Sequence, residues 1–207
     1  MKIAILGAGH VGGTLGQKWA AAGHEVVFGV RNPEEKRLGV KFGSGQLPIS
    51  FENVRTALDK AKVVVVAIPG RAAAELASEL APAFNGKIVI DASNNLQGPE
   101  MSCLGAIQRA APQARSFRAF NSLGWEVFAN PDFGGQTADL LYCGADDMEA
   151  QSVVENLISD VGLRPVRVGG LEVLAQVDML VQLWLALARG RGLGRHTAFK
   201  VLSDEAV

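Results

Sequence analysis

The sequence predicts an α/β fold, with a doubly wound and mostly parallel sheet followed by a small C-terminal α/β extension that ends in a long helix. Two observations carry this prediction. Short apolar runs alternate with longer amphipathic patterns along the chain, as expected where helices connect parallel strands. Several short runs are apolar at every position, which is typical of strands that are covered on both faces.

The spacing of these patterns places the elements along the chain. Strands are predicted at residues 2–6, 25–30, 63–68, 87–91, 116–121, 139–143 and 164–168. Helices are predicted at residues 11–22, 51–61, 71–84, 100–111, 147–161 and from 171 to about 189. The segment 121–137 has no clear periodicity, so we expect an ordered loop or a short helix there, at the edge of the sheet where ligands bind in this fold class.

The composition is that of a globular protein with one substantial domain. Of the 207 residues, 48% are hydrophobic and 20% are charged, which provides enough apolar material for a large core. We expect a main domain at residues 1–137 and a smaller lobe at 138–207, packed on it and contributing cleft and dimer contacts. Basic and acidic residues nearly balance, for a net charge of −1, so no global attraction to nucleic acid or to an anionic membrane is expected.

The cysteines and the longest apolar stretch bear on location. Cys103 and Cys143 lack the spacing of metal ligands, which favours a reducing compartment and predicts no metal site. The apolar stretch at 173–188 has about 16 residues, fewer than the roughly 20 that cross a bilayer. We therefore expect a cytoplasmic protein that makes no membrane contact.

A glycine-rich motif follows the first predicted strand and opens the first predicted helix. It matches the pattern G-x-G-x-x-G and consists of Gly7, Ala8, Gly9, His10, Val11 and Gly12. In this context the glycines allow a tight turn, close approach of a pyrophosphate and close helix packing, while the helix start offers free N–H groups to the phosphates. The motif predicts a Rossmann-type dinucleotide site at residues 7–12. A side-chain role for His10 is optional, because the backbone makes most phosphate contacts.

The end of the second strand predicts the choice of dinucleotide. An acidic residue there would bind the ribose hydroxyls of NAD, but the chain has Arg31 and Asn32 at this point. Arg31 is placed to bind the 2′-phosphate of NADP(H), so we expect NADP(H) rather than NAD(H). Lys36 or Arg37 is a candidate for a second charge, with an ordinary solvated helix face as the alternative.

Loops after later strands supply the candidate groups around the nicotinamide. Ile68 and Pro69 lie where one predicted strand closes, and Ser93, Asn94 and Asn95 lie where the next one closes. We expect both loops to project towards the nicotinamide half of the cofactor. For the two asparagines, hydrogen bonding within a turn is an equally good alternative.

The chain offers few side chains that could act as a proton donor. Tyr142, the only tyrosine, is followed four residues later by Asp146, which excludes the Tyr-x-x-x-Lys arrangement of short-chain dehydrogenases. The residues after 168 are too few for the helical domain of six-phosphogluconate-type dehydrogenases. We therefore assign no catalytic side chain and expect hydride transfer by alignment of two redox cofactors.

With these residues identified, the chain resembles the NADPH-dependent coenzyme F420 reductases over nearly its whole length, and is also similar to the oxidoreductase domain of the STEAP metalloreductases. The motifs that carry the resemblance are the glycine motif, Val30-Arg31, Ile68-Pro69, residues 87–91, Phe120-Asn121-Ser122, Phe128-Ala129-Asn130, residues 162–165 and the terminal helix. The resemblance implies that Arg31 holds the 2′-phosphate, that Ile68 and Pro69 border the nicotinamide, and that a deazaflavin stacks on the nicotinamide. It also implies a cleft floor formed by Asn121, Ser122, Leu123, Gly124 and Trp125.

The second substrate remains open within this resemblance. Archaeal F420 reductases have a Ser-Arg-Arg run at 30–32 and a His-Thr-Ile-Pro run at 121–124, where this chain differs. Segments 93–95 and 120–121 look closer to the metalloreductases, in which a flavin accepts the hydride. F420 is thus the first candidate acceptor and FMN or FAD the next, with a ferric reductase as a further reading. The alternatives are a non-enzymatic NADP(H)-binding sensor and an imine reductase, for which the C-terminal part is short.

Two aromatic or apolar features allow two interpretations each. Trp125 either stacks on a ring in the cleft or packs in the fold. The apolar stripe of the terminal helix is either core or a homodimer interface.

Overall fold

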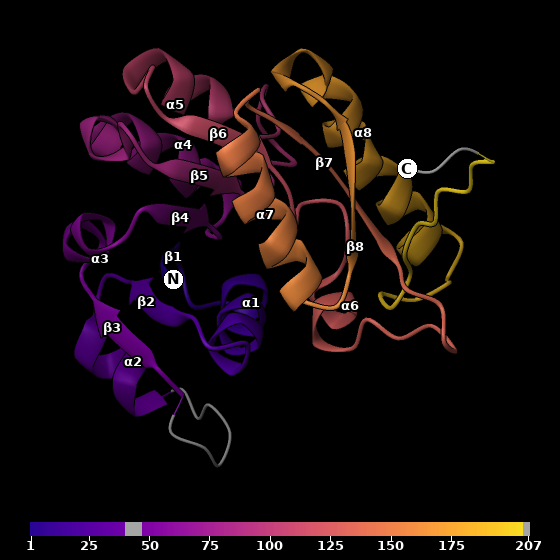
Figure 1. Cartoon of the computed structure of the whole chain (residues 1–207), viewed down its shortest axis with the longest axis horizontal. Coiled ribbons are helices and arrows are strands. Elements are labelled where there is room, and N and C mark those ends of the chain that lie inside the picture. The colour runs from indigo at the N-terminus through magenta and orange to yellow at the C-terminus, as the bar shows by residue number, and fades with distance from the viewer. Residues whose placement is uncertain (40–46, 205–207) are drawn as a thin grey trace.

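The first apolar run forms β1 (Lys2–Leu6), which lies inside an eight-stranded sheet of order β3-β2-β1-β4-β5-β6-β7-β8 (Figure 1). The computed structural model describes residues 1–39 and 47–204. The other strands are β2 (Glu25–Gly29), β3 (Ile49–Glu52), β4 (Val63–Val66), β5 (Ile88–Asp91), β6 (Arg115–Arg118), β7 (Asp139–Gly144) and β8 (Arg164–Gly169). β1 to β6 run parallel, whereas β7 is antiparallel to β6 and parallel to β8.

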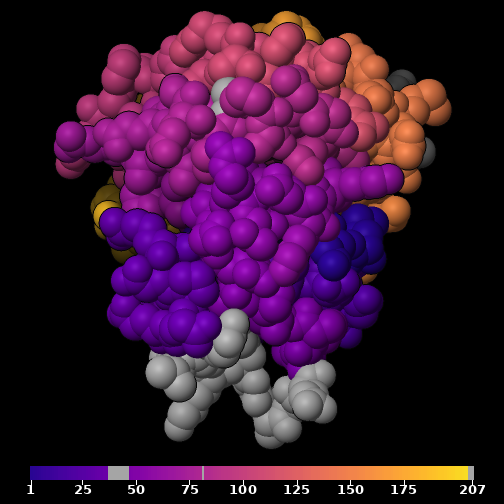
Figure 2. Space-filling view, turned by 90° about the vertical axis from the view of Figure 1, so that its left-hand side faces the viewer, coloured from indigo at the N-terminus to yellow at the C-terminus, as the bar shows by residue number. Residues whose placement is uncertain are grey.

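Helices connect the strands and cover both faces of the sheet. They are α1 (His10–Ala21), α2 (Pro33–Gly39), α3 (Val54–Lys60), α4 (Gly70–Leu80), α5 (Leu104–Ala110), α6 (Trp125–Ala129), α7 (Met148–Asp160) and α8 (Leu174–Leu185). Short 3₁₀ turns lie at η1 (Ala81–Phe84) and η2 (Leu171–Val173), and a π turn, η3 (Ala186–Gly190), extends α8. Seen from the side of β3, residues of α3 and α4 form the middle of the molecular surface (Figure 2).

Successive strand residues point to opposite faces, which produces two apolar cores. In β1, Ile3 and Ile5 contact a core closed by α1, α6 and α7 together with the end of α8. Ala4 and Leu6 contact a second core closed by α3, α4 and α5. Because both faces are covered, the strands can be apolar at every position. The predicted fold class, with its C-terminal α/β extension and long final helix, is confirmed.

The strand order reverses direction at β1, which lies between β2 and β4. From β1 the chain first moves outward through β2 and β3, and then returns to build β4, β5 and β6 on the other side. The loops at the carboxyl ends of β1 and β4 therefore diverge, and this is the place where doubly wound sheets bind their ligands.

One strand was not predicted from the sequence. Residues 51–61 were expected to form one helix, but Phe51 belongs to β3 and stacks on Phe28 of β2, with ring centroids 5.3 Å apart. The helix begins at Val54 because Asn53 caps it, its side chain accepting a hydrogen bond of 2.9 Å from the Thr56 amide. A capping signal at Asn53 thus sets the boundary between strand and helix.

The final helical run lies within one residue of its predicted bounds, but more of it is apolar than the stretch 173–188 indicated. Leu171–Gly190 spans 20 residues with a mean hydropathy of 1.5, which is long and apolar enough to cross a membrane by length and composition. The expectation of a stretch too short to span is therefore wrong. Val177, Val181 and Trp184 nevertheless pack into the protein, and Asp178 forms an ion pair with Arg118 of β6, as expected for a helix that lies on a sheet.

The C-terminal segment is held by a buried carboxylate at the start of β7. Asp139 is fully buried and accepts hydrogen bonds from Arg164 (2.8 and 2.7 Å), Lys200 (3.3 Å) and the Val201 amide (2.6 Å). Burial disfavours the charged carboxylate, but the hydrogen bonds from Arg164, Val201 and Lys200 prevail and lower the pKa of Asp139 below its usual value.

This cluster predicts a pH-dependent loss of stability. Because the pKa of Asp139 is lowered in the folded chain, its contribution is complete above the unfolded value of about 4 and is lost as the pH falls through the folded value. Asp139→Asn should lower the free energy of unfolding by about 2 kcal/mol at pH 7, and this deficit should shrink in acid. Urea denaturation at pH 7 and pH 3 tests this, and an equal deficit at both pH values would contradict it.

Candidate functional site

The glycine motif forms the turn between β1 and α1 and leaves an open space beside its backbone. Gly7 has a φ of +103°, and a Cβ there would lie 2.6 Å from Ile68 Cγ2, so only glycine fits. A Cβ at Gly9 would instead meet no atom within 4 Å. Gly9 is the N-cap of α1 and no side chain caps this end, so the first amides of the helix are available to an anionic oxygen.

Four loops meet at the carboxyl edge of the sheet and form a continuous rim around this opening. The loop after β4 contacts Gly7 through Ile68, and its Gly70 lies so close to the next loop that a Cβ would be 2.3 Å from the Asn95 amide nitrogen. Asn94 donates a hydrogen bond of 2.8 Å to the carbonyl oxygen of Asn121, in the loop after β6. The structure thus brings together the predicted residues of the loops after β1, β4, β5 and β6.

The predicted residues after β2 lie at the same edge and are solvent-exposed. Arg31 forms no ion pair or hydrogen bond within the described ranges of the chain. Asn32 donates a hydrogen bond of 3.1 Å to Glu35, and Lys36 is exposed on α2. The side chain of Arg37 lies outside the described residues. Arg31 is therefore free to bind an anionic group that reaches the end of β2.

His10 and Trp125 close the rim between α1 and α6. Their rings stack with centroids 5.0 Å apart and planes 18° apart. The next residue, Glu126, accepts a hydrogen bond of 2.5 Å from Arg195, whose guanidinium lies 5.2 Å from the ring centroid of Trp184. Burial opposes the charge of Glu126, but the hydrogen bonds from Arg195 and from its own backbone prevail and lower the pKa of this carboxyl.

The other predicted residues of the cleft floor point into the protein. Asn121, Ser122 and Leu123 are all buried, whereas Trp125 and Asn95 are partly exposed at the rim. Asn121 Oδ1 and Ser122 Oγ are buried without a hydrogen-bond partner. The turn that buries them begins at Phe120, which has a left-handed φ of 61° and is held between Trp19 and Phe128 by edge-to-face contacts of 5.6 Å each.

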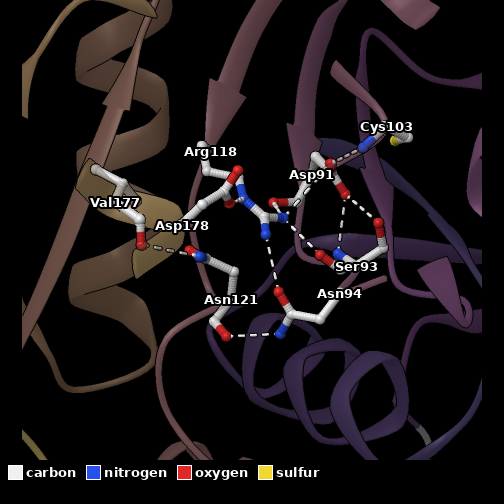
Figure 3. A network of polar contacts seen from close by, with 8 residues as sticks. All are labelled: Asp91, Ser93, Asn94, Cys103, Arg118, Asn121, Val177 and Asp178. Atoms are coloured by element: carbon white, nitrogen blue, oxygen red, sulfur yellow. Dashed lines mark hydrogen bonds and ion pairs between the residues drawn. The ribbon is translucent and has the colours of Figure 1, made fainter. Parts of the chain in front are cut away.

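A buried arginine that the sequence did not single out links these loops (Figure 3). Arg118, at the end of β6, is fully buried with Asp91, and its Nη1 lies 3.4 Å from an Asp91 carboxylate oxygen. Its Nε donates to Asp178 of α8 at 2.7 Å, and its Nη2 donates to Asn94 at 2.8 Å. The sequence signals for it were an arginine within the short predicted strand at 116–121 and an aspartate inside the most apolar helix.

The thiols are not poised for chemistry. Cys103 and Cys143 are both buried and unpaired, and burial is the main reason that the pKa of Cys103 is raised well above its usual value and that of Cys143 to about 11. Across residues 1–39 and 47–204, His, Cys, Asp and Glu side chains form no group of three that could hold a metal.

The fold and the glycine turn together define the class of protein, a doubly wound α/β protein of Rossmann type. Residues 2–95 match the family described as NADP oxidoreductase, coenzyme F420-dependent. The chain is 27% identical to the F420-dependent NADP reductase of Methanothermobacter marburgensis, over 90% of this chain and 92% of the relative. A candidate F420-dependent NADP reductase from Arthrobacter sp. FB24 superimposes with a TM-score of 0.83 at 25% identity, over 98% of this chain and 100% of that one.

A second group of relatives contains longer proteins. The chain is 29% identical to metalloreductase STEAP3 of Rattus norvegicus, over 86% of this chain but 36% of the relative. It therefore spans little more than a third of the length of the metalloreductases it matches. The resemblance to the F420-dependent NADP reductases and to the metalloreductases is thus confirmed, and both groups are oxidoreductases by name.

The open space at Gly9 predicts a substitution that weakens dinucleotide binding without changing the stability of the fold. Gly9 has a negative φ of −81°, which alanine tolerates, and a Cβ there contacts nothing in the protein. Gly9→Ala should leave the thermal midpoint unchanged, but weaken binding of a dinucleotide by about tenfold or more because the methyl group occupies the phosphate position.

Gly190→Ala is the matched control, since a Cβ there also meets no atom and the residue lies at the end of the π turn. Isothermal titration with NADPH measures the affinity of both variants. Equal affinity of Gly9→Ala and the wild type would contradict the placement of the phosphates at Gly9.

Proposed function

We propose that the chain is an NADP(H)-dependent oxidoreductase that transfers hydride between the nicotinamide and a second ring-type cofactor, with F420 as the first candidate and FMN or FAD as the second. The single observation that carries the proposal is a convergence at the carboxyl edge of the sheet. An uncapped helix start and the loops after β4, β5 and β6 form the rim, and beside it lies Arg31, which has no partner among the described residues. The named activities of the relatives support it.

The residues of the rim fit NADP(H) group by group. The free amides at the start of α1 and the open space at Gly9 suit the pyrophosphate. Arg31 is exposed beyond β2 and has no partner in residues 1–39 and 47–204, and the 2′-phosphate of the adenosine ribose lies at this point in this class of fold. Ile68, Pro69, Ser93 and Asn94 supply the remaining border. When bound, the dinucleotide would supply the hydride at its nicotinamide ring.

The protein's own contribution would be binding and alignment. Tyr142 is buried and donates a hydrogen bond of 2.5 Å to Glu155, away from the rim, so it does not serve as a proton donor there. Two redox rings held face to face need no dedicated acid for the hydride step. Trp125, stacked on His10 at the rim, is the aromatic side chain placed to border the second ring. We also infer a cytoplasmic location.

Anaerobic spectrophotometry tests the function. The purified protein is mixed with NADPH or NADH and, separately, with F420, FMN or FAD, while both cofactor absorbances are followed. Reduction of F420 by NADPH supports the proposal in its first form, and reduction of FMN or FAD supports the flavin form. NADPH that binds but is not oxidised by any of these acceptors would overturn the enzyme assignment in favour of a sensor.

Arg31 predicts the choice between the two dinucleotides. Arg31→Ala should weaken NADPH binding by about 10-fold to 100-fold and leave NADH binding nearly unchanged, because only NADPH carries the 2′-phosphate. The matched control is Arg109→Ala, which removes an exposed arginine on α5 and thus changes the net charge equally. An Arg31→Ala variant that binds the two dinucleotides in the wild-type ratio would refute this role.

We further propose that α8 forms the contact between two copies in a homodimer. Met179 and Leu183 are 65% and 49% exposed on this helix, where burial would gain free energy. Leu183→Glu should convert a dimer into monomers in size-exclusion chromatography with light scattering. Met148→Glu on α7, where Met148 is 89% exposed, is the control. A monomeric wild-type protein would refute the dimer.

A further inference from the structure

The guanidinium of Arg118 is bound by two segments that are distant in sequence, residues 91–94 and α8 (Figure 3). Its Nε binds Asp178 of α8, its Nη1 donates to the carbonyl oxygens of Asp91 (3.1 Å) and Ser93 (2.5 Å), and its Nη2 binds Asn94. A fully buried cation is tolerated only when its donors are satisfied in this way. The loop after β5 therefore has its backbone and one side chain fixed by a single residue of β6.

The constraint continues from Asn94 to the next loop. Asn94 accepts from Arg118 through Oδ1 and donates through Nδ2 to the carbonyl oxygen of Asn121. Asp91 holds the same loop from the other side, because its carboxylate accepts hydrogen bonds from the Ser93 amide (2.8 Å) and hydroxyl (2.6 Å) and from the Cys103 amide (2.7 Å). These contacts fix the position of the loop after β5 relative to the loop after β6.

We propose that Arg118 is a positioning residue for hydride transfer, and that Asp178 joins α8 to the same constraint. The guanidinium sets where Ser93 and Asn94 lie relative to Asn121, and thereby fixes the nicotinamide side of the rim. This inference rests on the proposed function, since it assigns the ordered loops to alignment of the nicotinamide. Arg118 itself is fully buried and is not a residue that would touch the cofactor.

A substitution of Asp178 offers a milder way to weaken the contact between Arg118 and α8. Burial raises the pKa of Asp178 above its usual value, although the charge and hydrogen bond of Arg118 oppose this. A raised pKa in the folded state means that folding favours the neutral carboxyl, so the stability contributed by this group falls as the pH rises through the raised value. Asp178→Asn retains an oxygen that accepts from Arg118 Nε but removes the charge, so it replaces the ion pair by a weaker neutral contact.

The test compares Arg118→Lys and Asp178→Asn with Arg164→Lys. Lysine retains the charge but cannot donate in the planar fork that reaches all four partners of Arg118. Arg164 makes a bidentate ion pair with buried Asp139, and this pair belongs to the C-terminal anchor and not to the rim. Arg164→Lys therefore measures how much stability is lost when an ion pair to a buried carboxylate is weakened away from the rim loops.

Three measurements are made on each full-length variant: the NADPH dissociation constant, the fluorescence anisotropy of the bound nicotinamide, and the single-turnover rate of F420 reduction at saturating NADPH. For Arg118→Lys we expect a dissociation constant within about threefold of the wild type, a lower anisotropy, and a rate lower by about 10-fold to 100-fold. Asp178→Asn should lose no more thermal stability than Arg164→Lys, and should lose about 3-fold to 10-fold in rate. Arg164→Lys should lose thermal stability only.

The outcomes distinguish the proposed oxidoreductase function from the positioning role of Arg118. Wild-type protein that fails to bind NADPH would overturn the proposed function and the positioning role with it. Wild-type protein that binds NADPH, with Arg118→Lys indistinguishable from Arg164→Lys in anisotropy and rate, would overturn the positioning role alone. If Arg118→Lys does not fold, Asp178→Asn decides, and an unchanged anisotropy and rate in that variant would overturn the role.

Discussion

A cation buried between two strands and a helix is the constraint on which much of this structure depends. Arg118 is fully enclosed, and an unpaired charge there would cost several kcal/mol. Its position therefore requires that β5 and the loop after it supply the Asp91 carboxylate and two carbonyl oxygens, and that α8 supply Asp178. The same contacts therefore hold α8 on the sheet and fix the conformation of the loop after β5.

The two halves of the rim are built by different means. At β1 and β2 the site consists of backbone, with glycines that create space and a helix start that offers amides, together with one exposed arginine. At β5 and β6 it consists of side chains that hold one another, from Asp91 through Arg118 and Asn94 to Asn121. The half at β1 and β2 suits a pyrophosphate, whose oxygens accept hydrogen bonds from several backbone amides. The half at β5 and β6 suits a planar ring that must be held in one orientation.

This difference explains what the sequence could predict. The glycine motif and Arg31 are local patterns, because the residues that act together lie within a few positions of one another. Arg118 lies 27 residues from Asp91 and 60 residues from Asp178, and no local pattern indicates that such residues meet. The sequence therefore predicted which loops lie at the edge of the sheet, but not the buried residues that hold those loops.

The same distinction applies to the fold. Strands that are apolar at every position, such as Val63–Val66, were predicted because burial on both faces is visible in their composition. β3 was missed because only Phe51 is buried within it, so it is an edge strand without a continuous apolar run. The bounds of the last helical run were predicted within one residue, but its apolar length was underestimated because only residues 173–188 were counted, whereas the helix of suitable hydropathy spans Leu171–Gly190.

The contact between His10 and Trp125 joins the two halves of the rim. His10 belongs to the glycine motif, and Trp125 begins the helix that follows the buried turn at 121–124. Because their rings are stacked, the His10 side chain covers one face of the tryptophan that borders the proposed second site. A ring-type acceptor that used this face would have to displace the His10 ring. Because aromatic stacking contributes about 0.5–1.5 kcal/mol, this displacement costs little free energy. The segment that binds the phosphates would then also control access to the acceptor site, and both rings would be aligned from one loop.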